Sequence, residues 1–154
     1  EFGHPEWIDF PREGNNWSMW YARRQWSLVM DKNLRYRHLA NFDRAMINCV
    51  ESHDNFYLRK GQKIHIDENN MIMIFERDGL FFCFNFHPAN SVSDYEFEVP
   101  GGKFELVLDS DAAVFGGYKR VAGDQQYFAL QRPSGMHLSI YLPCRTALVL
   151  QKIN

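Results

Sequence analysis

The spacing of apolar side chains divides the chain into two parts. Between about residues 17 and 51, apolar residues recur at steps of three and four, the period of an amphipathic helix; the clearest are Leu39, Phe42, Met46, Cys49 and Val50. We expect the side-chain oxygen of Asp31 or Asn33 to cap this helix. A shorter, less regular helical stretch is predicted from Trp17 to Arg24.

After residue 61 the pattern changes to short strands. Met71–Glu76 and Leu80–Phe86 flank an Asp-Gly pair, which between two apolar runs favours a tight hairpin. Pro100-Gly101-Gly102 indicates a second turn, between alternating apolar positions at residues 95–99 and a strand at residues 104–108. Further strands are predicted over residues 118–121, 126–130, 137–142 and 146–150. Seven or eight short strands predict a mainly β fold, an antiparallel β-sandwich.

Composition narrows the classes of partner. The 154 residues are 45% hydrophobic and 16% aromatic, which excludes disorder for most of the chain and suits one domain. A formal charge of −2 provides no positive field, so we expect no nucleic acid and no membrane surface as partner. The longest apolar runs are far below the roughly 20 residues that span a bilayer. Three widely spaced cysteines are typical of reduced, buried thiols in a cytoplasmic protein.

The tryptophans are distributed unevenly. All four lie within the first 26 residues, at Trp7, Trp17, Trp20 and Trp26. The first 50-odd residues are too few to form a core of their own, so another layer must cover these rings. That layer is either the β-rich part of this chain or a further part of a longer protein.

A long stretch of the sequence resembles glycogen and starch branching enzymes of the alpha-amylase superfamily. The resemblance rests on Gly-His-Pro-Glu-Trp-Ile-Asp-Phe-Pro-Arg at residues 3–12 and on Asn-Asn-Trp-Ser-Met-Trp-Tyr-Ala-Arg-Arg-Gln-Trp at residues 15–26. It continues through Asn-Phe-Asp-Arg-Ala-Met at 41–46, Phe-Asn-Phe-His-Pro at 84–88, Asp-Ser-Asp-Ala at 109–112 and Phe-Gly-Gly at 115–117. The last residues, 148–153, are more similar to eukaryotic than to bacterial members.

The resemblance implies that the chain is the C-terminal portion of such an enzyme. Residues 1–55 would be the last loop and helix of a (β/α)₈ catalytic barrel, an incomplete α-helical remnant, and residues 56–154 the C-terminal β-sandwich domain. The family cleaves alpha-1,4 glucan chains and rejoins them through alpha-1,6 bonds. Its partners here would be an alpha-glucan (glycogen, amylose or amylopectin) and the missing barrel of the same chain. The cytoplasm is the expected location, or a plastid in a plant-like organism.

We expect no catalytic residue in the chain itself. The resemblance places the family's catalytic carboxylates upstream of Gly3, and retaining cleavage needs two carboxyl groups about 5–5.5 Å apart. Val50-Glu51-Ser52-His53-Asp54 mimics a superfamily motif, but it follows the last helix, where a polar helix-terminal loop is the simpler interpretation. The isolated chain is therefore predicted to be inactive.

Glu6, Trp7 and Arg12 are the predicted glucan-binding residues. The resemblance places them just after the last barrel strand, at the face where barrels gather their binding loops. An aromatic ring suits the apolar face of a glucose unit, while Glu6 and Arg12 offer an acceptor and donors to hydroxyls. The alternative is that Trp7 anchors the loop and Glu6 pairs with an arginine.

No metal and no cofactor are expected. Asp109-Ser110-Asp111 lacks the glycine and the distal glutamate of a calcium loop, and no histidine and cysteine positions share a zinc-like spacing. Gly116 and Gly117 are predicted to provide positive φ between strands.

Two other functions stay open at this point. One is a stand-alone, non-catalytic glucan-binding β-domain, which a well-packed tryptophan segment would favour. The other is an interaction domain without affinity for sugar. A broad apolar surface left open by residues 1–50 would favour the fragment of a longer enzyme.

Overall fold

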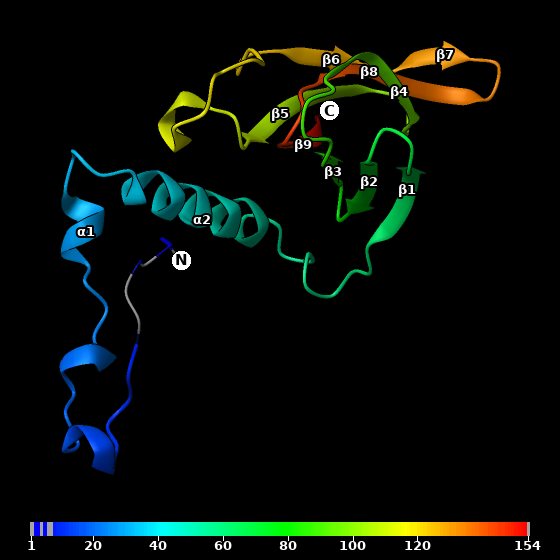
Figure 1. The fold of residues 1–154 in the computed structure, drawn as a ribbon. Helices are drawn as coiled ribbons and strands as arrows, with labels where there is room; N and C mark the ends of the chain where they lie inside the picture. The colour runs from blue at the N-terminus through cyan, green and yellow to red at the C-terminus, as the bar shows by residue number, and fades with distance from the viewer. Residues whose placement is uncertain (1, 4, 6–7, 154) are drawn as a thin grey trace.

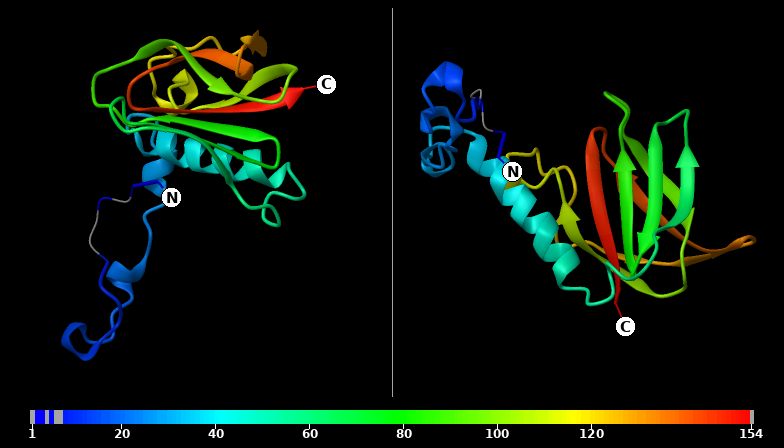
Figure 2. Two further views of the ribbon diagram at one scale, coloured as in Figure 1. Left: turned by 90° about the vertical axis from the view of Figure 1, so that its right-hand side faces the viewer. Right: turned by 90° about the horizontal axis from the view of Figure 1, so that it is seen from below.

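The computed structural model, which describes residues 2–3, 5 and 8–153, has three parts (Figure 1). An N-terminal arm, residues 8–30, contains only short turns of helix: η1 (Glu13–Asn15), η2 (Trp20–Ala22) and α1 (Ser27–Met30). The long helix α2 (Tyr36–Glu51) follows. The rest is a β-rich body, from which the arm extends away in the views of Figures 1 and 2.

The β-rich body consists of two antiparallel sheets packed face to face. The larger has the strand order β1-β2-β3-β9-β5-β6 and the smaller β4-β8-β7. Alternate residues point into the shared core, which includes Ile72, Phe104 and Leu138. The predicted antiparallel β-sandwich is confirmed. The strands are β1 (Gln62–Asp67), β2 (Ile72–Arg77), β3 (Leu80–Asn85), β4 (Val92–Glu98), β5 (Lys103–Asp109), β6 (Gln126–Phe128), β7 (Leu130–Arg132), β8 (Gly135–Leu142) and β9 (Thr146–Ile153).

The β2–β3 hairpin turns where the sequence predicts. Asp78 and Gly79 both have positive φ, 53° and 81°, which the two central residues of a type I′ turn require. Arg77 and Leu80 close the ladder beside the turn. The Asp-Gly pair therefore sets the register that places the phenylalanines of both strands.

Strand β5 contains a β-bulge where α2 packs on the larger sheet. Leu106 pairs with Leu150 and Leu108 pairs with Val149, so Val107 is an extra residue on the β5 side. Leu106 packs on the sandwich core, whereas Val107 and Leu108 both belong to the apolar cluster beneath α2. The bulge thus widens the apolar face that the helix covers.

Helix α2 lies along the outer face of the larger sheet (Figure 2). Cys49 and Val50 pack near Phe82 of β3 and Val149 of β9. The predicted helix is confirmed, but the predicted cap is wrong. The residue before the helix is Arg35, with no side-chain capping bond, and Asp31 Oδ1 instead accepts a 2.8 Å bond from the Asn33 N–H in a turn.

Two predicted elements are absent because backbone conformation interrupts them. Residues 17–24 contain only the turn η2, since Asn16 and Trp17 adopt left-handed φ of 53° and 57°. Residues 118–121 form no strand, because Lys119 is left-handed and its neighbours donate their N–H groups to Asp111.

Two further strand boundaries differ from the prediction. Strand β1 was not predicted because most of its side chains are exposed. The predicted strand 126–130 is instead two strands, β6 and β7, which belong to different sheets. Between them the Ala129 N–H donates a 2.9 Å bond to the Gly102 carbonyl, where the chain crosses from one sheet to the other.

Candidate functional site

Of the three predicted glucan-binding residues, the structure describes Arg12. Glu6 and Trp7 lie outside the described residues. Arg12 Nε and Nη2 donate bonds of 3.0 and 3.2 Å to the carboxylate of Asp9, and Asn15 Nδ2 donates another of 3.0 Å. These hydrogen bonds lower the pKa of Asp9. The Arg12 guanidinium therefore holds the loop of residues 9–15 in place through Asp9. Its remaining N–H donors are exposed to solvent.

The arm leaves its large apolar side chains open to solvent. Trp17, Trp20 and Trp26 are 69%, 76% and 57% exposed, and Phe10 and Met30 are more exposed than buried. Phe2 contacts the ring of Trp26 at 5.1 Å, so that ring is partly covered from within the chain. Because the helical stretch predicted from Trp17 to Arg24 is absent apart from η2, Trp17, Trp20 and Tyr21 do not lie on one helical face. The β-rich body does not cover this segment.

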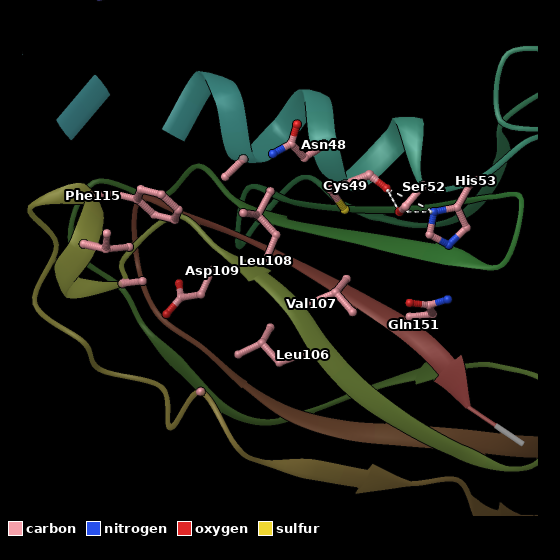
Figure 3. A pocket seen from close by; sticks show the side chains of 14 residues that line it. Asn48, Cys49, Ser52, His53, Leu106, Val107, Leu108, Asp109, Phe115 and Gln151 are labelled. Carbon is pink, nitrogen blue, oxygen red and sulfur yellow. Dashed lines mark hydrogen bonds between the residues drawn. The ribbon is translucent and has the colours of Figure 1, made fainter. Parts of the chain in front are cut away.

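A pocket of about 550 Å³ separates the C-terminal half of α2 from β5 (Figure 3). Asn48, Ser52 and His53 project toward it from the helix side, while Asp109 and Gln151 approach from the strands. Asp109 lies near Phe115 at one end, and Ser52 and His53 lie at the other (Figure 3). Polar groups from both layers therefore border the pocket, mostly at opposite ends of the apolar floor that residues 106–108 of β5 provide.

Ser52 and His53 do not form a nucleophile and a base. The Ser52 hydroxyl donates a 2.9 Å bond to the Cys49 carbonyl, and His53 Nδ1 lies 3.0 Å from the same oxygen. Because a carbonyl only accepts, Nδ1 carries the proton, and this is the nitrogen 3.1 Å from the Ser52 hydroxyl. It cannot take the hydroxyl proton. The polar helix-terminal loop predicted for residues 50–54 fits this arrangement.

Asp109 is the one carboxylate among the described residues that line this pocket. Burial raises the pKa of its carboxyl, although Oδ1 accepts a 2.8 Å bond from the Asp111 N–H. A retaining mechanism requires a second carboxyl across the sugar bond. Asp111 does not supply it, since both its oxygens bind Arg120. The described residues that line the pocket therefore include no pair of carboxyl groups for glycosidic cleavage.

Asp111 and Arg120 form the most buried ion pair of the described residues, and no pattern in the sequence predicts it. Arg120 Nε lies 2.8 Å from Asp111 Oδ2, and Arg120 Nη2 also donates to the Cys144 carbonyl. Burial raises the pKa of Asp111, but the bonds from Arg120 and from the Tyr118 N–H outweigh it and lower the pKa overall. The pair fixes the loop of residues 111–120 against the start of β9.

The glycines and cysteines of this region differ partly from expectation. Gly116 has the predicted positive φ of 77°, whereas Gly117 is required because a Cβ there would overlap the Asp111 backbone. The three cysteines form no disulfide; Cys83 and Cys144 are buried, as predicted, and Cys49 is half-buried. Within the described residues, no group of three or more His, Cys, Asp or Glu is placed to hold a metal ion.

Comparison with known proteins assigns the fold. The family described as alpha amylase, C-terminal all-beta domain matches residues 64–153, more than half of the chain. The chain belongs to this family. Its matched segment begins in β1 and ends with β9, so it covers the whole sandwich of this alpha-amylase C-terminal domain.

Curated relatives match almost the whole chain. It is 46% identical over 160 residues to a 1,4-alpha-glucan-branching enzyme of Dictyostelium discoideum and 44% identical over 156 residues to that of Candida glabrata. A chloroplastic/amyloplastic 1,4-alpha-glucan-branching enzyme of Oryza sativa subsp. japonica is 48% identical over 139 residues. These matches cover 100%, 99% and 88% of this chain but only 23%, 22% and 16% of the relatives. The matched part is their C-terminal region.

The described part of the chain contains no helix long and apolar enough to cross a membrane.

Proposed function

We propose that this chain is the C-terminal, non-catalytic part of a 1,4-alpha-glucan branching enzyme. The observation that carries the proposal is the unequal coverage: the chain aligns from end to end with branching enzymes, yet accounts for less than a quarter of their length. The cleavage of alpha-1,4 bonds and the formation of alpha-1,6 bonds then belong to polypeptide outside the chain. Among the described residues, the pocket beneath α2 has one carboxyl group and no second, which supports this division.

In this proposal residues 1–55 complete a catalytic barrel and residues 56–154 form a domain that stabilises it. The exposed tryptophans of the arm support the first part, because a remnant of a larger core leaves such rings without their cover. A stand-alone glucan-binding module would be expected to pack that segment on its own β-body. The proposed location is the cytoplasm, or a plastid in a plant-like organism.

The test of the main proposal is an activity assay with two proteins. Branching lowers the absorbance of the amylose–iodine complex, so the assay reports it directly. The 154-residue chain is expected to leave the absorbance unchanged, and the longer native polypeptide, isolated from the source cells with antibodies against this chain, is expected to lower it. Branching by the short chain alone would overturn the proposal.

We also propose that Glu6, Trp7 and Arg12 contact the alpha-glucan in the longer enzyme. The exposed guanidinium of Arg12 supports this role, because it keeps donors available beside the Asp9 contact. Arg12→Gln and Asp9→Asn both weaken that contact, but only the first removes the guanidinium. Arg12→Gln is therefore expected to raise KM for amylose several-fold more than Asp9→Asn. Equal effects would assign Arg12 a purely structural role.

A further inference from the structure

The pocket beneath α2 contains a carboxylate oxygen that the described part of the chain does not pair. Asp109 is only 8% exposed, and its carboxylate accepts one hydrogen bond from the described residues, from the Asp111 N–H to Oδ1. Every described side-chain nitrogen or oxygen that is fully buried has a hydrogen-bond partner. The unpaired Oδ2 is therefore open to the pocket that Asp109 lines. Such an oxygen is expected to accept a hydrogen bond from a molecule in the pocket.

Three further polar groups border the pocket. Asn48 of α2 and Gln151 of β9 each carry a side-chain amide that makes no hydrogen bond with the described residues. His53 donates the proton on Nδ1 to the Cys49 carbonyl, so Nε2 is the ring nitrogen left to accept a bond. Nε2 lies on the side of the ring that faces Gln151 in Figure 3. Hydrogen-bond donors and acceptors are thus available on both the helix side and the sheet side.

The floor between these groups is apolar. Leu106, Val107 and Leu108 of β5 form it, and the ring of Phe115 lies at the same end as Asp109 (Figure 3). The volume of about 550 Å³ is within the range of about 300–1,000 Å³ that is typical of small-molecule sites. An apolar surface bordered by a few hydrogen-bonding groups is the combination with which proteins bind small polar molecules.

The charges of the pocket favour an uncharged ligand. No lysine or arginine is among the described residues that line it, so nothing there would pair with a phosphate or carboxylate group. A hydroxyl group both donates and accepts, which suits the carboxylate of Asp109 at one place and side-chain amides at others. The C–H face of a sugar ring suits the apolar floor and the Phe115 ring. The pocket therefore favours a compound that carries several hydroxyl groups.

The ends of the pocket favour a short ligand. Asp109 and Phe115 lie at one end, and Ser52 and His53 lie at the other (Figure 3). A molecule of one or two sugar rings could bond the polar groups along this length and remain inside the pocket. A longer chain would have to leave through the open side, where it would gain no further contact with these groups.

We propose that the pocket beneath α2 binds a small, uncharged polyhydroxyl compound, a free monosaccharide or disaccharide. Asp109 Oδ2 accepts from one hydroxyl, the amides of Asn48 and Gln151 bond others, and the ring lies on the apolar floor. Because this ligand contacts α2, β5 and β9 together, its binding holds the helix on the larger sheet. The inference does not depend on the proposed function, which assigns no ligand to this pocket.

The test is a titration of the 154-residue chain with maltose, followed by ¹⁵N NMR and by thermal unfolding. Maltose is expected to shift the amide signals of residues 45–53 and 106–109 more than those of other residues. It is also expected to raise Tm, because a ligand that binds the folded state stabilises it.

Two variants and a matched control locate the site. Asn48→Ala removes one amide of the pocket and is expected to raise the Kd for maltose several-fold. Asn41→Ala, on the same helix but outside the pocket, is expected to leave the Kd unchanged. Asp109→Asn keeps an oxygen for the Asp111 N–H but replaces the acceptor Oδ2 by a donor, and is expected to weaken binding as well. The Tm of each variant without maltose reports whether it folds.

Four outcomes would overturn the inference. Maltose that shifts no amide signal would show that the pocket binds no small sugar. Shifts elsewhere on the chain, with a Kd that Asn48→Ala leaves unchanged, would place the site outside the pocket. Tighter binding of spermidine than of maltose would identify a cation as the ligand of Asp109, and tighter binding of maltoheptaose would identify a glucan chain. None of these outcomes changes the branching assay of the longer polypeptide, so they are distinct from a failure of the proposed function.

Discussion

The β-sandwich and the N-terminal arm are both rich in aromatic residues, but these residues are buried in the sandwich and exposed in the arm. Phe81, Phe97 and Phe104 lie in a core between two sheets and are almost inaccessible to solvent. Trp17 and Trp20 of the arm are exposed to solvent. The difference lies in the layers: the sandwich supplies two apolar faces that cover each other, whereas no described layer of the chain covers Trp17 and Trp20. The aromatic content of a segment thus indicates how much apolar surface must be buried, but not which part of the protein buries it.

The largest expected effect tests this contrast directly. Phe104→Ala removes a fully buried ring and is expected to lower the free energy of unfolding by about 3–5 kcal/mol. Trp20→Ala removes a larger but exposed ring and is expected to change it by less than about 0.5 kcal/mol in this chain. Urea denaturation followed by circular dichroism measures both. A cost above about 1 kcal/mol for Trp20→Ala would mean that the arm packs on the chain.

The second prediction compares the stability lost when each of two ion pairs of the β-rich body is broken. Arg120→Ala leaves the buried Asp111 carboxylate without its partner and is expected to cost about 2 kcal/mol, somewhat discounted because Arg120 is partly exposed. Arg132→Ala breaks the exposed pair with Glu96 and is expected to lower the free energy of unfolding much less, because solvent screens this pair. Equal losses in urea denaturation would contradict the structural role assigned to the 111–120 loop.

The stability difference between the wild-type chain and Arg120→Ala is expected to depend on pH. The folded pKa of Asp111 is lowered, so its stabilising contribution is complete above the unfolded value of 3.8 and is lost as the pH falls through the folded pKa. The gap between the two urea midpoints should therefore stay constant from about pH 7 to about pH 5 and narrow below about pH 4. A gap that widened on acidification would contradict the assignment of the charge pair.

The smallest effect concerns the pocket beneath α2. Burial raises the folded pKa of Asp109, so ionising its carboxyl costs stability as the pH rises from 3.8 through the folded pKa. Asp109→Asn keeps an oxygen for the Asp111 N–H and removes the charge. The variant is expected to have a slightly higher urea midpoint at neutral pH and none of this gain at about pH 3. A lower midpoint at neutral pH would show that the charge is used in a contact of the folded chain.

The sequence predicted the elements whose signal is local. The period of α2 and the Asp-Gly turn of the β2–β3 hairpin depend on neighbours within a few residues, and both were correct. The strand expected at residues 118–121 was wrong because Asp111, several residues earlier, captures the backbone N–H groups of Tyr118 and Arg120. A hydrogen bond to a side chain several residues away produces no periodic pattern in the sequence.

The candidate sites were less predictable than the fold. The ion pair of Asp111 and Arg120 joins residues that are nine positions apart. The loop between them has no sequence pattern from which its path could be predicted. The packing of α2 on the outer face of the larger sheet did leave a signal in the sequence: β3 is apolar on both faces, which indicates a strand covered on both sides. The resemblance supplied the predicted glucan-binding residues, and of these Arg12 has a described partner, Asp9.

The size of the native polypeptide tests the central claim most directly. Mass spectrometry of the protein captured from the source cells by antibodies against the β-sandwich determines it. Since the matched region is 22% of the Candida glabrata relative, we expect a species between four and five times as long as this 154-residue chain. A native protein of only 154 residues would contradict the claim.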